Sequence, residues 1–141
     1  RWRYLAIEAN PGNSKLHPQI VKSPANEGWN ESFRFEPVTD VDSWAKKYGG
    51  APYIAATDNF VLLSWQEELR GCVAAISKKE IRPDGSFPVM RCISTPPGYA
   101  GVREGLQWNS LCPLSNNRFL FVTSNKGRIK IFPGEVKNKE R

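Results

Sequence analysis

The chain has 141 residues and a formal net charge of +6; 40% of its residues are hydrophobic and 24% are charged. This composition excludes a disordered chain and is typical of a single globular domain with many turns. No apolar run approaches the roughly 20 residues that a membrane-spanning helix needs, so we expect no membrane association. The positive charge favours acidic or nucleic-acid partners but does not specify a fold.

Three predicted β-hairpins follow one another along the chain. The first, near residues 3–22, joins YLAIEAN to QIV through a proline-flanked connection. The second, near residues 52–66, joins YIAATDN to FVLLSW, and the third, near residues 118–132, joins FLFVTSN, which follows Arg118, to RIKIF. Each first strand starts with an aromatic and an aliphatic residue and ends at asparagine, so we interpret the hairpins as copies of one repeat.

Weaker signals lie between the hairpins. NESFRFEPV and GLQWNSLCPL predict further strands, and residues 44–48 predict a short helix that ends at a glycine pair. The charged stretch at residues 78–88, KKEIRPDGSFP, is predicted to be a loop insertion between the second and third copies. The alternative is a long hairpin with strands near residues 72–77 and 88–94.

The repeat also predicts how its strands are buried. The first strand of each copy is almost entirely apolar, which is typical of a strand covered on both faces. The second strand alternates most clearly at Arg128-Ile129-Lys130-Ile131, so we expect the isoleucines to face inward and the basic residues to face solvent. Because no such hairpin is stable alone, the copies must stack. We therefore expect an all-β fold of repeated antiparallel sheets in a single region over residues 1–141.

The stretches YIAATDNFVLLSW and RFLFVTSNKGRIKIF resemble the inner hairpin of WD40-type β-propeller blades, with Trp65 and Phe132 where such blades often carry the tryptophan of the Trp-Asp pair. The chain has no Trp-Asp or Gly-His pair. The resemblance is therefore to divergent blades, such as those of WD-repeat subunits of transcription factor IIIC. It implies a non-enzymatic scaffold that binds protein subunits of a larger nuclear or cytoplasmic complex.

The number of copies conflicts with a closed ring. A propeller normally needs roughly four to eight blades, and the sequence shows three hairpins. The alternatives are a fragment of a longer propeller, assembly of blades between chains, or a different β fold.

The candidate contact residues are basic. One group lies on the third hairpin and the tail after it: Lys126, Arg128, Lys130, Lys137 and Lys139. Such residues could neutralise nucleic-acid phosphates or bind an acidic protein; the alternative is that they only keep an exposed strand soluble. A second group, Lys78, Lys79 and Arg82, lies in the predicted loop and is a candidate for partner contact, with an unused loop as the alternative.

Catalytic and metal sites find no support in the sequence. The single histidine, His17, lies in a proline-flanked loop without a nucleophile elbow, and no glycine-rich phosphate loop is present. The cysteines Cys72, Cys92 and Cys112 form no C-x-x-C pair, which argues against a zinc site and favours small buried residues in a reducing compartment. We therefore expect no enzyme activity, no metal and no cofactor.

Two other functions remain open. A compact β-barrel could bind single-stranded nucleic acid through the basic hairpin face. Exposed tryptophans could instead bind glycans, although packing between sheets is the other explanation for them. The five tryptophans are Trp2, Trp29, Trp44, Trp65 and Trp108.

Overall fold

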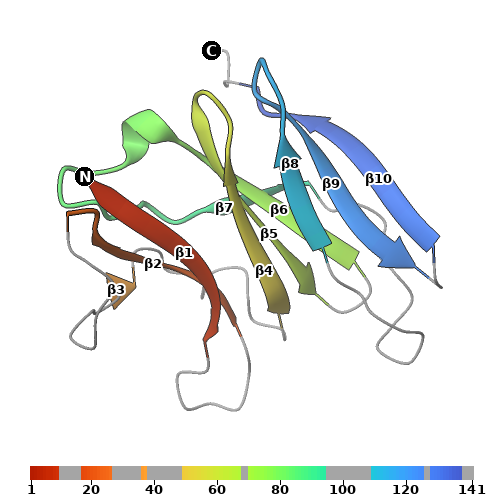
Figure 1. The fold of residues 1–141 in the computed structure, drawn as a ribbon, viewed down its shortest axis with the longest axis horizontal. Coiled ribbons are helices and arrows are strands. Elements are labelled where there is room, and N and C mark those ends of the chain that lie inside the picture. The colour runs from red at the N-terminus through yellow and green to blue at the C-terminus, as the bar shows by residue number, and fades with distance from the viewer. Residues whose placement is uncertain are drawn as a thin grey trace.

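The computed structural model describes residues 1–9, 17–26, 36–37, 49–67, 70–94, 109–125 and 128–137. These residues form β-strands and one short 3₁₀ helix, so the predicted all-β fold is confirmed (Figure 1). Within these ranges, no helix is long and apolar enough to cross a membrane. The helix predicted at residues 44–48 lies outside the described residues.

The described strands form three antiparallel, blade-like sheets in which neighbouring strands follow chain order (Figure 1). The first sheet contains β1 (Trp2–Ala9), β2 (His17–Pro24) and β3 (Glu36–Pro37). The second contains β4 (Gly49–Ala56), β5 (Phe60–Glu67), β6 (Arg70–Ser77) and β7 (Arg91–Ser94). The 3₁₀ helix η1 (Lys78–Glu80) follows β6. The third sheet contains β8 (Asn109–Pro113), β9 (Arg118–Asn125) and β10 (Arg128–Glu135).

All three predicted hairpins are present as antiparallel strand pairs, β1–β2, β4–β5 and β9–β10. Residues 78–90, which include the predicted loop at 78–88, connect β6 to β7, and these strands pair antiparallel, so the alternative of a long hairpin is confirmed. β8 confirms the strand predicted from GLQWNSLCPL at Asn109–Pro113. Of NESFRFEPV, the structure describes only Glu36–Pro37, which form β3.

The hairpins occupy different positions in their sheets, which corrects the expectation of equivalent copies. The second hairpin begins with β4, the first strand of its sheet, whereas the third begins with β9, which follows β8. The first strand of the first hairpin, β1, runs in the opposite direction to the first strand of the second hairpin, β4. The Ala51 amide at the start of β4 donates to Glu8 near the end of β1, so β1 is antiparallel to β4 (Figure 1). The recurring unit is therefore the sheet, in which β5–β6 correspond to β9–β10.

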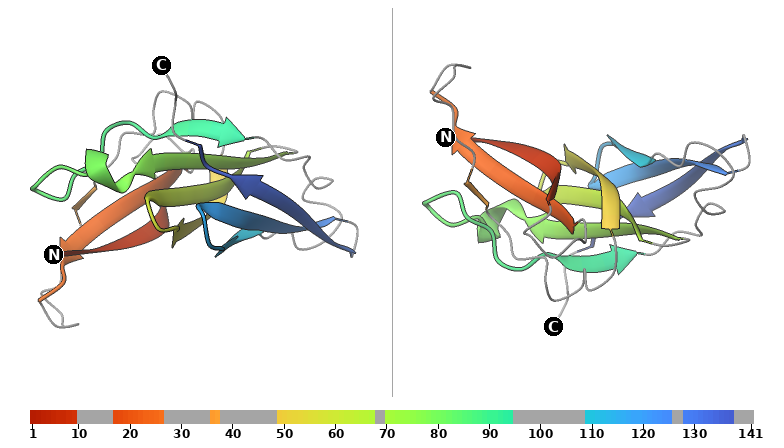
Figure 2. Two further views of the ribbon diagram at one scale, coloured as in Figure 1. Left: turned by 90° about the horizontal axis from the view of Figure 1, so that it is seen from above. Right: turned by 90° about the horizontal axis from the view of Figure 1, so that it is seen from below.

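The middle sheet lies between the other two sheets and contributes to both hydrophobic cores (Figure 2). Because side chains alternate along a strand, Leu63 faces the first sheet and Leu62 faces the third. The core shared with the first sheet contains Ile20, Val61, Leu63, Trp65, Cys72, Ala74, Ile76, Phe87 and Met90. The core shared with the third sheet contains Phe60, Leu62, Val73, Leu111, Phe119, Phe121 and Val136.

β5, the second strand of its hairpin, is covered on both faces, whereas the first strands β1 and β4 are not, which corrects the expectation for them. Every side chain from Phe60 to Trp65 is buried. By contrast, Leu5 and Ile7 on β1 are each 37% exposed, and Tyr53 on β4 is 43% exposed. β1 and β4 are edge strands of their sheets, whereas β5 is an interior strand of the covered middle sheet. Trp65 therefore packs between sheets and is not available to bind bases or glycans.

The isoleucines of β10 face solvent, which overturns the inward orientation predicted for them. Ile129 is 76% exposed and Ile131 is 56% exposed. β10 pairs with β9 so that Phe132 lies opposite Phe121, and Phe132 packs on the core between the second and third sheets. Alternation then places both isoleucines on the other face of the sheet. The orientation of the isoleucines is decided by the register of β10 with β9, and the sequence of β10 alone does not predict it.

Candidate functional site

The predicted basic group on the third hairpin does not form one patch among the described residues. Arg128, Lys130 and Lys137 are exposed, and Lys126 and Lys139 lie outside the described residues. Val136 is buried, and its amide donates to the Asn117 carbonyl at 3.0 Å. The chain after β10 is therefore held at the end of the strand opposite Arg128. An eight-residue strand is about 27 Å long, so Lys137 is far from Arg128.

The predicted partner loop packs against the first sheet. Lys78 and Lys79 on η1 are exposed. Arg82 is also exposed, but its guanidinium donates to the Phe87 carbonyl at 3.0 Å and to Ser86 Oγ at 3.3 Å, which closes the loop. Phe87 is 3% exposed and belongs to the core between the first and second sheets. Much of the loop is therefore packed against the rest of the protein. The cationic side chains of Lys78 and Lys79 remain exposed to solvent.

The loop is attached to the first sheet by a set of contacts that we call the clamp, formed by Trp2, Tyr4, Lys22, Asp84 and Gly85. The Tyr4 hydroxyl donates to the Gly85 carbonyl at 2.8 Å, and the Lys22 ammonium donates to the Asp84 carbonyl. The same ammonium lies 3.9 Å from the centre of a Trp2 ring, a cation–π contact. Gly85 has φ +82°, and a Cβ there would lie 2.8 Å from the Trp2 ring. The clamp is thus a close fit between two sheets.

Burial raises the pKa of the Tyr4 hydroxyl, and the nearby Asp84 carboxylate adds to this effect. The pKa of Asp84 is lowered, mainly because its carboxylate accepts hydrogen bonds from the Ser86 hydroxyl and amide. The positive charges of Lys22 and Arg82 lower it further. Both shifts come from the contacts that hold the clamp, so they are structural.

The cysteines occupy different environments. Cys72 is buried in the core between the first and second sheets, as expected. Cys92 and Cys112 are exposed, which corrects the expectation of burial for these two, and none of the three is in a disulfide. Within the described ranges, no group of three or more metal-ligating side chains comes together.

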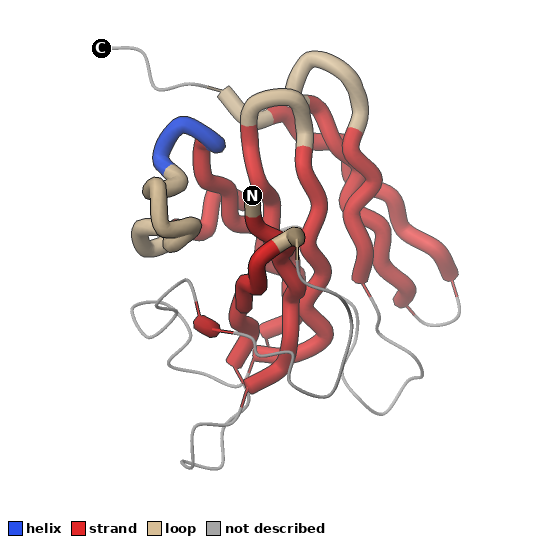
Figure 3. The backbone as a smooth tube through the Cα atoms, turned by 60° about the vertical axis from the view of Figure 1, so that its left-hand side comes forward, coloured by secondary structure: helices blue, strands red, loops and turns tan. Residues whose placement is uncertain are grey.

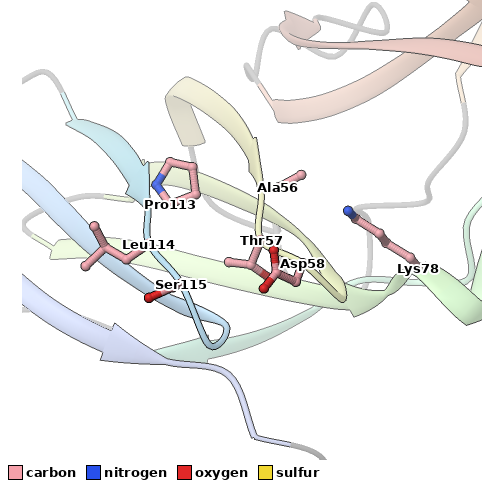
Figure 4. Close-up of a pocket in the computed structure, with 7 residues that line it drawn as sticks. All are labelled: Ala56, Thr57, Asp58, Lys78, Pro113, Leu114 and Ser115. Atoms are coloured by element: carbon pink, nitrogen blue, oxygen red, sulfur yellow. The ribbon is translucent and has the colours of Figure 1, made fainter.

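A depression of about 460 Å³ lies between the β4–β5 turn and the β8–β9 turn (Figure 4). Its lining consists of Ala56, Thr57, Asp58, Lys78, Pro113, Leu114 and Ser115. Lys78 contributes a cation from η1, and Asp58 a carboxylate from the β4–β5 turn. Ser115 Oγ accepts a hydrogen bond from Arg118 at 3.1 Å. The described lining therefore offers one charge of each sign.

The two turns beside this depression are joined through Asn117. Its Oδ1 accepts hydrogen bonds from Thr57 Oγ1 and from the Asn59 amide, both at 3.0 Å, and its Nδ2 donates to Asn59 Oδ1 at 2.8 Å. Figure 3 shows these turns side by side at one end of the molecule. The contacts connect the second and third sheets at that end.

A second depression, of about 390 Å³, lies where β1 ends and where β4 and β8 begin, and we call it the junction pocket. Its lining consists of Ala6, Ile7, Glu8, Ala51, Pro52, Tyr53 and Asn109. Glu8 Oε1 accepts from the Ala51 amide at 2.5 Å, and Asn109 Nδ2 donates to the Ala51 carbonyl at 2.7 Å. Ser64 Oγ in turn donates to Asn109 Oδ1 at 2.5 Å. This network joins all three sheets.

The junction pocket does not follow from the sequence patterns. Its polar contacts join residues far apart in the chain: Glu8 and Ala51 are 43 positions apart, and Ala51 and Asn109 are 58 positions apart. One available signal was Asn109, a polar residue two positions before the apolar Leu111, so that both side chains lie on the same face of the strand. Another was the glycine pair before Ala51, since glycine within a strand often marks a bulge.

No known family model, curated protein or solved structure matches the chain.

Proposed function

We propose that the chain is a non-enzymatic interaction scaffold whose propeller-like sheets pack against further β-sheets of a larger assembly. The observation that carries this proposal is the open apolar face of the third sheet. The resemblance of the hairpins to divergent WD40-type blades supports the same function, and it favours a nuclear or cytoplasmic complex of protein subunits.

The open face, which we call the outer face, contains apolar side chains from all three strands of the third sheet. The strand register places them together: Cys112, Leu120, Val122, Ile129, Ile131 and Pro133. Leu120 and Val122 are half-buried, and the two isoleucines are the most exposed large apolar side chains described. A contiguous apolar patch of this kind marks an interaction surface in a folded protein.

The two interfaces already present support a β-sheet as the partner of this face. The first sheet packs on one face of the middle sheet, and the third sheet packs on the other, each through apolar side chains of interior and edge strands. The outer face is the next position in the same stack (Figure 2). A further antiparallel sheet with an apolar face would bury it in the same way.

The alternatives receive less support from the geometry. The described strands form three separate sheets with free edges, whereas a closed barrel has no edges. The exposed basic residues Arg128 and Lys137 lie at opposite ends of β10, so they do not line one phosphate track.

Light scattering of the purified chain during size-exclusion chromatography tests the proposal. We expect the uncovered outer face to make the 15.9 kDa chain self-associate as its concentration rises. Ile129→Lys combined with Ile131→Lys should give a monomer with an unchanged circular dichroism spectrum, because these side chains are exposed. The matched control, Arg128→Ala combined with Lys130→Ala, alters the opposite face of β10 and should still associate. A wild-type chain that stays monomeric at all concentrations would overturn the proposal.

A further inference from the structure

The junction pocket has a chemistry that the outer face does not share. It lies beside β1, β4 and β8, which are edge strands of their sheets, whereas the outer face lies on the far side of the third sheet. Among the described residues, its lining contains one carboxylate, Glu8, and no basic side chain. The described lining therefore favours a positively charged group.

The Glu8 carboxylate is held in place but keeps unused acceptor capacity. Its Oε1 accepts the Ala51 amide proton at 2.5 Å. No described residue donates to Oε2. An ionised carboxylate has about four acceptor positions on its two oxygens, so Glu8 can bind a cation without releasing Ala51.

The backbone that holds Glu8 is itself held on both sides. Ala51 has φ +53°, a conformation that is uncommon outside glycine, and it lies in the irregularity between Gly50 and Tyr53. Its amide is bound by Glu8, and its carbonyl is bound by Asn109, which is 8% exposed. Such strain persists where the surroundings fix it, and it often occurs at ligand-binding sites. The carboxylate is thus positioned before any ligand arrives, which lowers the entropic cost of binding.

Beside the carboxylate, the wall of the pocket is apolar and aromatic. Ile7 is 37% exposed and Tyr53 is 43% exposed, and Pro52 lies between Ala51 and Tyr53. An aliphatic stem can lie along Ile7 and Pro52, and a cation next to the Tyr53 ring gains a cation–π contact. The pocket therefore suits a cation that is carried on an aliphatic chain.

The geometry distinguishes lysine from arginine. A guanidinium binds best to both oxygens of a carboxylate, in parallel hydrogen bonds. In the junction pocket, Oε1 already accepts the Ala51 amide proton, so a guanidinium that binds both oxygens has to share Oε1 with that amide, whereas Oε2 is unoccupied by described donors. An ammonium is a compact charge and needs only one oxygen.

We infer that the junction pocket binds a lysine side chain of a partner polypeptide, with the ammonium on Glu8 beside the Tyr53 ring and the stem along Ile7 and Pro52. This assigns the protein a recognition site that is separate from the outer face. The two surfaces can act on different partners, since one is defined by charge and the other by apolar area.

Titration of the isotope-labelled chain with blocked tripeptides, followed by NMR, tests the inference. The probes are glycine–lysine–glycine and the same tripeptide with norleucine or arginine in the centre. We expect the lysine peptide to shift the amide signals of Ile7, Ala51 and Tyr53 to saturation. Norleucine should not do so, and arginine should bind more weakly than lysine. Equal shifts from the norleucine peptide, or tighter binding of arginine, would overturn the assignment.

Two variants of matched charge complete the experiment. Glu8→Gln keeps an oxygen that can accept the Ala51 amide proton but removes the charge, and it should weaken lysine binding by about tenfold or more. Glu80→Gln makes the same charge change on exposed η1 and should leave binding unchanged. Unchanged affinity in Glu8→Gln contradicts the inference. The Ile129→Lys, Ile131→Lys chain should bind as the wild type does, so failure here is separate from failure of the outer-face proposal.

Discussion

Asp84 shows how a single exposed side chain supports the clamp. Its carboxylate accepts from the Ser86 amide at 3.0 Å and from the Ser86 hydroxyl at 2.6 Å, which shapes the turn that contains Gly85. The turn must be tight, because Gly85 lies against the Trp2 ring. A hydrogen-bonded carboxylate thus fixes the backbone that Tyr4 and Lys22 contact from the first sheet.

This arrangement predicts a pH dependence of stability. The pKa of Asp84 in the folded chain lies below its ordinary value of 3.8, so ionised Asp84 contributes stability above that value. The contribution is lost as the pH falls through the folded-state pKa. Asp84→Asn should therefore flatten the fall in stability between about pH 5 and pH 2, measured by urea unfolding at each pH. The control is Asp58→Asn at an exposed turn outside the clamp. A curve for Asp84→Asn that runs parallel to the wild type would contradict this role.

Among the elements, the two neighbouring turns depend on each other. Asn116 and Asn117 have φ of 59° and 58°, and both lie in the β8–β9 turn. Only Asn117 reaches across to Thr57 and Asn59 in the β4–β5 turn. Asn116 and Asn117 therefore both shape the β8–β9 turn, and Asn117 also binds the β4–β5 turn.

Glycine substitutions can separate these two roles. Asn116→Gly and Asn117→Gly both relax a positive φ, but only Asn117→Gly removes the hydrogen bonds between the turns. We expect Asn117→Gly to be less stable than Asn116→Gly by about 1–2 kcal/mol in urea unfolding, since each lost bond is worth about 1 kcal/mol. Equal stability of the two variants would show that the bridge contributes nothing.

At the scale of the whole molecule, the middle sheet makes the three sheets one cooperative unit. Leu62 and Leu63 are neighbours in β5 and are both 0% exposed, yet they belong to different cores. The first and third sheets therefore meet only through the middle sheet in these cores. A substitution that leaves a cavity in either core should therefore destabilise all three sheets.

Leu62→Ala and Leu63→Ala test this cooperativity. Each should cost about 2–5 kcal/mol of unfolding free energy, because each leaves a cavity in a packed core. In hydrogen exchange, either variant should lose protection in both β1–β2 and β9–β10. Ile129→Ala, at a position 76% exposed, is the control and should change little. Loss of protection in the third sheet alone for Leu62→Ala would show that the sheets unfold independently.

The sequence by itself determined the strands and hairpins of this protein. Apolar stretches such as YIAATDN and FVLLSW specify adjacent strands because side-chain alternation and turn chemistry are local properties of the chain. The same local patterns indicate the all-β class. They also contain no catalytic motif. The exposed Lys78 and Lys79 could also be located, since a charged, turn-rich stretch lies at the surface.

Only the tertiary structure decided which faces are covered and which residues meet. Ile129 and Ile131 look like core residues in sequence, but the pairing of Phe132 with Phe121 turns them to solvent. The junction pocket needs Glu8 and Asn109 to meet Ala51 from different sheets. The physical reason is that a strand's pattern fixes its alternation, whereas the register with its neighbours and the order of the stack fix what each face contacts.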